Sequence, residues 1–244
     1  QTAANFEAKT SYAITITAND GVNTTVQAIT VSVNDLNDNA PVFADVNYDI
    51  SIVENTKGPT LLETTDADTN STVSYSLSGA DAADFEIVNS TLALKEAADF
   101  ETKSSYAVTV TASDGLNSTT QAVTYTITDA NDNAPVFTSN AAVSIVENTK
   151  GPTLLETTDA DTNSTVAYSL SGADADDFEI VNKTLALKQD ADYESPSDAN
   201  TDNIYNVTVS ATDNNGNNTT TQDITVTIKD TNDNRPVITS PNVF

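Results

Sequence analysis

Four short acidic motifs recur in the same order along this sequence. Each full period carries a Glu in Val-Glu-Asn, an Asp-Ala-Asp pair, an Asp-aromatic-Glu pair and a segment that ends in Asn-Asp-Asn-x-Pro. A single Asp also follows each of three Tyr-bearing segments, at Asp20, Asp114 and Asp213. Ca²⁺ is a hard cation that takes six to eight oxygens from carboxylates, amides and backbone carbonyls. The motifs supply these groups and therefore predict calcium binding.

Other chemistries fit these residues less well. Paired carboxylates can act as the acid and the base of a glycosidase, and Asp66 and Asp68 allow that interpretation. The chain has no Trp to form a sugar platform, however, and no insertion that would build a cleft. Solvated surface acids are the usual explanation of acidic clusters, but five motifs in one order are unlike a random scatter. We therefore expect a binding protein and not an enzyme.

Composition excludes several classes of protein. The 36 Asp and Glu against 9 Lys and Arg give a net charge of -27, which opposes binding to nucleic acid and to anionic membranes. The absence of His and Cys removes disulfides, zinc-thiolate sites and the Ser-His-Asp triad. No apolar run is long enough to span a membrane, so we expect no membrane insertion by this segment.

The chain is built from repeats. Residues 51–73 are identical to residues 144–166, and the pattern Asn-Asp-Asn-x-Pro begins at Asn37, Asn131 and Asn232. Each period has the size of a β-sandwich domain. We therefore expect full domains at 42–135 and 136–236. Residues 1–41 match only the last part of a period and residues 237–244 only its start, so these segments are interpreted as parts of incomplete domains.

Alternation of apolar and polar residues predicts strands and almost no helix. Residues 106–112 place Tyr106 and two Val on one face and Thr on the other, as in a half-buried strand. Seven strands are expected in the first full period, near residues 46–53, 60–65, 72–77, 85–88, 91–95, 105–112 and 121–128. Tyr12, Tyr106 and Tyr205 are expected in the core. The two strands of residues 1–41 cannot bury a core alone, so another polypeptide, upstream or from a second copy, is expected to complete their sandwich.

The ordered motifs resemble the cadherin repeat. They read Val53-Glu54-Asn55, Asp66-Ala67-Asp68, Asp99-Phe100-Glu101, Ala112-Ser113-Asp114-Gly115 and 129–135 (Asp-Ala-Asn-Asp-Asn-Ala-Pro). The resemblance covers the whole chain, counting both partial ends. It implies an all-β fold of tandem seven-stranded Greek-key β-sandwiches arranged end to end, with Ca²⁺ at each junction.

The resemblance also implies a ligand set for each junction, in which some residues contribute backbone carbonyls. For the junction between 42–135 and 136–236 the set is Glu54, Asp99, Glu101, Asp129, Ala130, Asn131, Asp132, Asn133, Asp159, Asp161, Asn163 and Asp213. For the junction before Val42 it is Glu7, Asp35, Asn37, Asp38, Asn39, Asp66, Asp68, Asn70 and Asp114. For the junction after the second full domain it is Glu147, Asp192, Glu194, Asp230, Asn232 and Asp233.

One position departs from this pattern. Asn5 stands where the other two periods have Asp99 and Asp192. An amide has one acceptor oxygen and no charge, so weaker or absent binding of at least one ion is expected at the first junction. The sequence also carries several Asn-x-Ser/Thr triplets, such as the one at Asn89. Chance explains them in a chain rich in Asn and Thr, and glycosylation is left open.

The function expected from the sequence is mechanical. The segment resembles a Ca²⁺-rigidified extracellular spacer of a large repeat adhesin or surface fibre in cell adhesion, and its near-identical periods and lack of Cys favour a bacterial surface protein. The alternative is a homotypic or strand-exchange module that assembles cells or subunits. Expected partners are calcium ions, adjacent repeats and other copies of the same protein.

Overall fold

The computed structural model describes residues 3–214 and 218–239, in two compact units, residues 1–130 and 131–244. Each unit is described by itself. Most of the segment 237–244 and part of the polar loop near residue 216 lie outside the described residues. Apart from two short 3-10 turns, Ala82–Asp84 and Ala175–Asp177, the described elements are β-strands. None of the helical segments in these ranges is long and apolar enough to cross a membrane.

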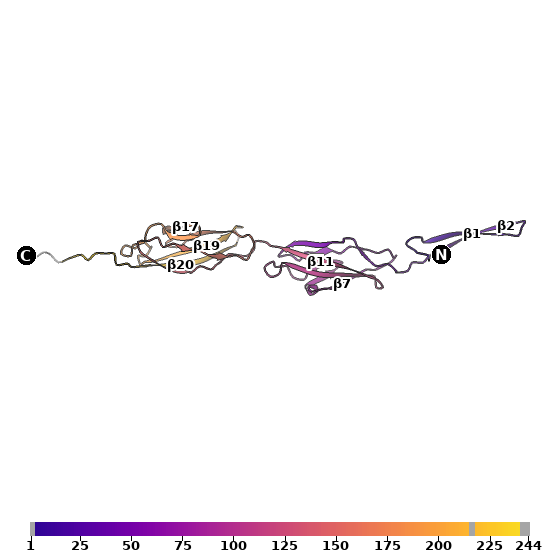
Figure 1. Cartoon of the computed structure of the whole chain (residues 1–244), viewed down its shortest axis with the longest axis horizontal. Helices are drawn as coiled ribbons and strands as arrows, with labels where there is room; N and C mark the ends of the chain where they lie inside the picture. Colours follow the sequence, from indigo (N-terminus) through magenta and orange to yellow (C-terminus); the bar gives the residue numbers. More distant parts are fainter. Residues whose placement is uncertain (1–2, 215–217, 240–244) are drawn as a thin grey trace, which may run out of the picture. The chain divides into compact units, whose positions relative to one another are not determined.

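The first unit begins with a two-stranded hairpin (Figure 1). Strands β1 (Ser11–Asn19) and β2 (Thr24–Ser32) pair antiparallel, with Ile14 opposite Ile29. Their apolar face stays open, since Ile14 is 48% exposed. The alternation predicted from the sequence is therefore present without a core to cover it.

A full sandwich follows the hairpin. Its strands are β3 (Val42–Phe43), β4 (Tyr48–Val53), β5 (Thr60–Leu61), β6 (Thr64–Thr65), β7 (Ser74–Ser78), β8 (Phe85–Val88), β9 (Thr91–Leu94), β10 (Ser105–Ser113) and β11 (Ser118–Thr128). One sheet has the order β4-β11-β10-β7, and the opposing strands have the orders β5-β9-β8 and β3-β6. Strand β4 pairs parallel with β11 although the two are far apart in sequence, so non-local pairing fixes the topology.

The core lies between these layers. The inward residues of β10 and β11 include Val108, Val110 and Tyr125, all at most 3% exposed. The Tyr125 hydroxyl lies 2.8 Å from the Gly58 carbonyl oxygen and donates to it. Gly58 has a φ of +58°, and a Cβ added to it would lie 2.7 Å from the Ile52 side chain. Both the positive φ and the lack of space favour glycine at this position.

Two strands differ from their predicted form. The stretch expected at 60–65 is interrupted, because Thr60–Leu61 pairs with β9 whereas Thr64–Thr65 pairs with β3. Between them Leu62 points into the core, at 3% exposure. The strand expected at 46–53 is β4, and the short strand β3 that precedes it and pairs with β6 was not predicted. Alternation along one strand carries no information on such a change of partner, so the sequence pattern did not reveal it.

The second unit repeats this arrangement. Its strands are β12 (Val136–Phe137), β13 (Ala142–Val146), β14 (Thr153–Leu154), β15 (Thr157–Thr158), β16 (Val166–Ser171), β17 (Phe178–Val181), β18 (Thr184–Leu187), β19 (Ile204–Asp213) and β20 (Thr219–Lys229). The orders β13-β20-β19-β16, β14-β18-β17 and β12-β15 match those of the first unit, and β17 lies in the layer opposite β19 and β20 (Figure 1). Tyr205 is buried as predicted, at 1% exposure, whereas Tyr12 on the open hairpin is 36% exposed.

Candidate metal centres

Two groups of carboxylates meet at the start of the first sandwich and share one residue. Ligand oxygens of Glu7, Asp35 and Asp68 lie within 4.8 Å of one another, and so do those of Asp66, Asp68 and Asp114. The turn that precedes β1, the linker and two loops of the sandwich each contribute to them. The structure thus brings together most of the acids predicted for this junction.

Backbone and side-chain donors hold these acids in place. The N–H and the amide of Asn39 donate to the two oxygens of Asp68, at 2.9 and 2.7 Å. The N–H of Asp68 donates to Asp66 at 3.0 Å, and the Ser71 hydroxyl donates to the other Asp66 oxygen at 2.8 Å. The predicted Asp38 is exposed instead and accepts from the amide of Asn39.

Two oxygens in this set are buried without a hydrogen-bond partner among the described residues. They are Oδ1 of Asp35 and Oδ2 of Asp114. The other oxygen of Asp35 accepts from the hydroxyl and the N–H of Thr69, and these bonds lower the pKa of Asp35. The N–H of Asn117 lowers the pKa of Asp114 in the same way. Both groups are therefore favoured as anions, and the second oxygen of each accepts no hydrogen bond from the described residues.

The Asn5 turn has the same local form as its counterpart at the other end of the sandwich. Asn5 Oδ1 accepts the N–H of Ala8 at 2.7 Å, and Asp99 Oδ1 accepts the N–H of Thr102 at 3.0 Å. The hydroxyl of Thr102 also bonds to the second oxygen of Asp99 and lowers its pKa. The amide therefore reproduces the turn but supplies no charge.

At the far end of the first sandwich, Glu54 is 3% exposed. Its two oxygens accept the N–H of Ala130 at 2.7 Å and the N–H of Phe100 at 2.8 Å. Carboxylate oxygens of Glu54 and Asp129 each lie within 4.8 Å of an oxygen of Glu101. Glu54 therefore ties the predicted Asp-aromatic-Glu turn to the start of the linker.

The start of the second unit repeats the first junction's contacts. Asn133 donates to both oxygens of Asp161, at 3.0 and 2.9 Å, and Ser164 donates to Asp159 at 2.7 Å. The Asn131 side chain lies 2.7 Å from Asp213 Oδ2 and 2.9 Å from Asp161 Oδ2. With its oxygen directed inward it completes an all-oxygen set, and with its nitrogen inward it donates to both acids.

At the other end of the second unit, Glu147 is 2% exposed and accepts the N–H groups of Thr231 and Tyr193. Its carboxylate forms a group within 4.8 Å with those of Asp192 and Glu194. Asp233 accepts from Asn148 outside this group. The predicted ligands Asp230 and Asn232 are exposed and join no acidic group among the described residues.

Two asparagines that were not predicted from the sequence organise the linkers. The Asn117 amide donates to the carbonyl of Asn39 at 3.0 Å and to Asn37 Oδ1 at 3.1 Å. Asn218 donates to the carbonyl of Asn131 at 3.2 Å and to Asp213 at 2.9 Å. Asn117 follows Asp114 by three residues, as Asn23 follows Asp20, and this recurrence was a signal available in the sequence.

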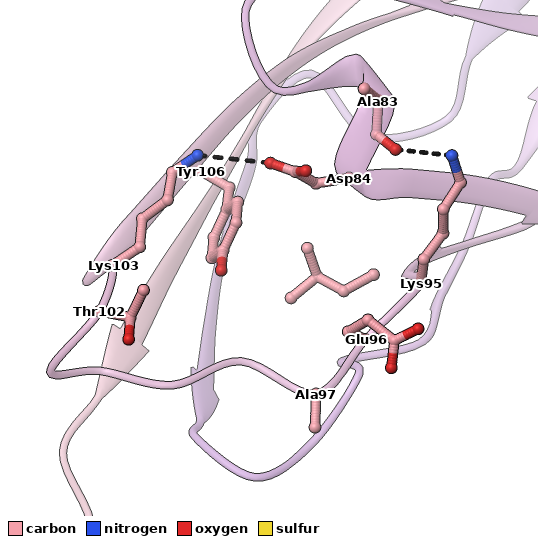
Figure 2. A pocket seen from close by; sticks show the side chains of 9 residues that line it. Ala83, Asp84, Lys95, Glu96, Ala97, Thr102, Lys103 and Tyr106 are labelled. Carbon is pink, nitrogen blue, oxygen red and sulfur yellow. Dashed lines mark hydrogen bonds and ion pairs between the residues drawn. The ribbon is translucent and has the colours of Figure 1, made fainter.

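One recess of the first sandwich differs from these acidic sites. It has a volume of about 450 Å³ and lies beside Tyr106. Figure 2 shows that its two lysines are already engaged, Lys103 with Asp84 and Lys95 with the carbonyl of Ala83. Both ammonium groups are thus neutralised or hydrogen-bonded within the domain.

The acidic sets fit a hard divalent cation. Two unit charges about 4 Å apart repel by about 1 kcal/mol in water, and by more where water is excluded. No lysine or arginine in the described ranges lies within ion-pair distance of Asp35, Asp66, Asp68 or Asp114. The donor set is entirely oxygen, which matches Ca²⁺ and not a softer metal. Bound Ca²⁺ would supply the missing positive charge.

Comparisons with known proteins agree with the fold and the motifs. The family model described as Cadherin domain matches residues 48–128 and 141–229. Human Protocadherin Fat 1 is 34% identical over 247 residues, which cover 95% of this chain and 5% of that protein. The Fat-like cadherin-related tumor suppressor homolog of Drosophila melanogaster is 38% identical over 91 residues, which cover 33% of this chain and 2% of that protein. The chain therefore spans only a small part of these relatives.

Solved structures show the same architecture. The crystal structure of the protocadherin GammaB4 extracellular domain has a TM-score of 0.78 and 30% identity, over 98% of this chain and 40% of that one. Mouse cadherin-23 EC22-24 has a TM-score of 0.71 at 22% identity, over 93% of this chain and 77% of that one, which supports the fold alone. The family model, the relatives and the solved structures together show that this chain belongs to the cadherin family and carries two cadherin domains.

Proposed function

We propose that this chain is a non-catalytic, Ca²⁺-rigidified spacer within a larger extracellular adhesion protein. The observation that carries the proposal is the pair of acidic groups that share Asp68, with buried oxygens of Asp35 and Asp114 left without hydrogen-bond partners in the described ranges. Ions bound there would connect the linker to loops of the sandwich and limit its bending. The bacterial setting is part of the same proposal, resting on the lack of Cys and the near-identical periods.

Small-angle X-ray scattering in Ca²⁺ and in EGTA tests this function. We expect a longer and stiffer particle in Ca²⁺, because ions held jointly by linker and domain residues restrict rotation between them. The matched control replaces Asp66, Asp68, Asp159 and Asp161 by Asn, which keeps size and polarity but removes charge. Its scattering should not respond to Ca²⁺. Identical profiles of the unsubstituted chain in both buffers would refute the spacer role.

A homotypic module is the second candidate, and the open face of the β1–β2 hairpin favours it. Ile16 is 50% exposed, whereas its counterpart Val110 in β10 is fully buried. Sedimentation velocity separates the two functions. A spacer changes its frictional ratio on addition of Ca²⁺ and stays monomeric, whereas a homotypic module shows Ca²⁺-dependent dimers.

The same hairpin supports the proposed division into domains. We infer that residues 1–41 belong to a cadherin-like domain whose other strands come from another stretch of polypeptide, since an isolated two-stranded ribbon is marginal in water. Amide exchange at Ile14 and Val31 measures this directly in the 244-residue chain at low concentration. We expect rapid exchange. Strong protection in a demonstrated monomer would show that the hairpin is stable alone.

A further inference from the structure

The two full domains close their Asp-aromatic-Glu turns, at residues 99–101 and 192–194, in different ways. In the first domain, the hydroxyl of Thr102 donates to the second carboxylate oxygen of Asp99 at 2.9 Å. The N–H of Lys103 donates to the backbone carbonyl of Asp99, also at 2.9 Å. Both closing bonds therefore come from the two residues that directly follow the turn.

The second domain has neither of these bonds. Ser195 and Pro196 stand at the two positions that follow its turn. Proline has no N–H to donate, and in the described ranges the Ser195 hydroxyl makes no bond to Asp192, which accepts only the backbone N–H groups of Glu194 and Ser195. The turn therefore needs another group to fix it.

Asn203, at the far end of a loop that is longer in this domain, supplies that group. Counted back from the buried tyrosine of the next strand, it stands where the first domain has Ser104. Its side-chain amide donates to the carbonyl of Tyr193 at 2.9 Å. The N–H of Tyr193 donates to Glu147 at 2.8 Å. The middle residue of the turn is therefore held through its N–H and through its carbonyl.

The loop that carries Asn203, residues 195–203, is itself fixed to the domain. Asp198 is 2% exposed, and its carboxylate accepts the N–H groups of Asp202 and Asn203 at 2.9 and 3.2 Å. The N–H of Ala199 donates to Asp174 at 2.7 Å. The amide of Asn203 is therefore presented to the turn from a supported position.

The conformation of Asn203 favours this assignment. Its φ is +65°, a value that asparagine adopts more readily than most residues. Its Oδ1 is buried and has no hydrogen-bond partner among the described residues, and such burial costs free energy. The bond to Tyr193 is what the side chain gains by pointing inward.

We propose that Asn203 is a positioning residue for a cation held by Glu147, Asp192 and Glu194. The inference rests on the proposed function, because it takes Ca²⁺ to bind at the acidic ends of the domains. One carboxylate oxygen of each of the three acids lies within 4.8 Å of the others, and Tyr193 joins two of them in the sequence. Fixing the peptide groups of Tyr193 before the ion binds lowers the ordering cost of binding.

A Ca²⁺ titration of the ¹⁵N-labelled chain, followed by amide NMR, measures two acidic sets in one sample. The reporters are the amides that donate to the two buried glutamates, namely Tyr193 and Thr231 in the second domain and Phe100 and Ala130 in the first. Asn203→Gly removes the side-chain amide and tolerates the positive φ. We expect the Ca²⁺ midpoint of the second-domain reporters to rise about two- to tenfold, the range for one lost hydrogen bond. The first-domain reporters should keep their midpoint.

The matched control is Asn200→Ala, because Asn200 lies in the same loop but donates to Asp202 and not to the turn. It should change neither midpoint. The amides of Ala199 and Asp202 show whether the loop keeps its structure, and Asn203→Ser, which carries the first domain's residue, repeats the test if glycine alters them. An unchanged second-domain midpoint, or an equal rise in both domains, would overturn the role of Asn203. Absence of any Ca²⁺ response in the unsubstituted chain would instead count against the proposed spacer function.

Discussion

Replacing Asp114 by Asn should stabilise the first unit without Ca²⁺ and weaken its response to Ca²⁺. Asp114 Oδ1 accepts the N–H groups of Leu116 and Asn117, both at 2.7 Å, and an Asn side chain can keep both bonds. Its Nδ2 would replace the buried oxygen that has no hydrogen-bond partner among the described residues. One carboxylate oxygen of Asp114 lies within 4.8 Å of oxygens of Asp66 and Asp68. The substitution therefore changes charge with little change of shape.

The magnitude follows from the removed charge. Unit charges about 4 Å apart repel by about 1 kcal/mol in water, and the substitution removes two such pairs. In EGTA the unfolding midpoint should therefore rise by a few degrees. A divalent ion attracts a carboxylate about 2.4 Å away by roughly 3 kcal/mol even in water, and each 1.4 kcal/mol is about tenfold in affinity. Ca²⁺ affinity should fall at least tenfold.

Thermal unfolding in EGTA and in Ca²⁺, with calorimetric titration of Ca²⁺, measures both effects. Asp20→Asn is the matched control, since Asp20 accepts the same pair of turn N–H groups but joins none of the acidic groups among the described residues. It should leave Ca²⁺ affinity unchanged. If Asp114→Asn lowered the midpoint in EGTA, or kept full affinity, the electrostatic account of this site would be wrong.

Three further predictions concern other parts of the chain. Asn5→Asp should raise Ca²⁺ affinity at the first junction several-fold and Asp99→Asn should lower it at the other end of the sandwich, as measured by calorimetry; no change in either would refute the ligand assignment. Tyr125→Phe should cost about 1–3 kcal/mol in urea unfolding, because buried partners of its hydroxyl lose a hydrogen bond. The Lys103 ammonium holds the pKa of Asp81 below its usual 3.8. This carboxylate therefore contributes stability above that pH, which is lost as the pH falls through its folded-state pKa, so Asp81→Asn should flatten the acid side of the stability curve.

Much of the fold could be predicted because each strand of the sandwich buries alternate residues. Val108 and Val110 illustrate this, since both stand on the predicted inward face of β10 and both are buried. The repeat set the period, and the two full domains have matching strand orders in the structure. The alternation of a strand is visible in a short stretch of sequence, however, whereas the pairing of strands joins residues that are far apart in the sequence. The partner change at Leu62 was therefore absent from the pattern.

The acidic residues of the candidate site could be predicted from the sequence, but the groups that orient them could not. Asp66, Asp68 and Asp114 were marked by the spacing of their motifs, and the fold brings them together. Asn117 was not predicted because its side-chain amide is uncharged and because Asn is common in this sequence, so nothing set this residue apart. Asp230 was predicted from the repeat alone and lies exposed.

The buried glutamates show why ion binding and linker geometry belong to one problem. Glu54 accepts N–H groups from Phe100 and from Ala130, so the direction of the chain leaving β11 depends on a carboxylate 3% exposed. Glu147 makes the corresponding bonds to Tyr193 and Thr231. These hydrogen bonds hold both oxygens of each glutamate in place within its acidic set. The neighbouring carboxylates of each set repel one another, and a bound divalent cation would offset that repulsion. Under the proposed spacer function, ion binding at the acidic ends would change the stiffness of the linkers and not the fold of the domains.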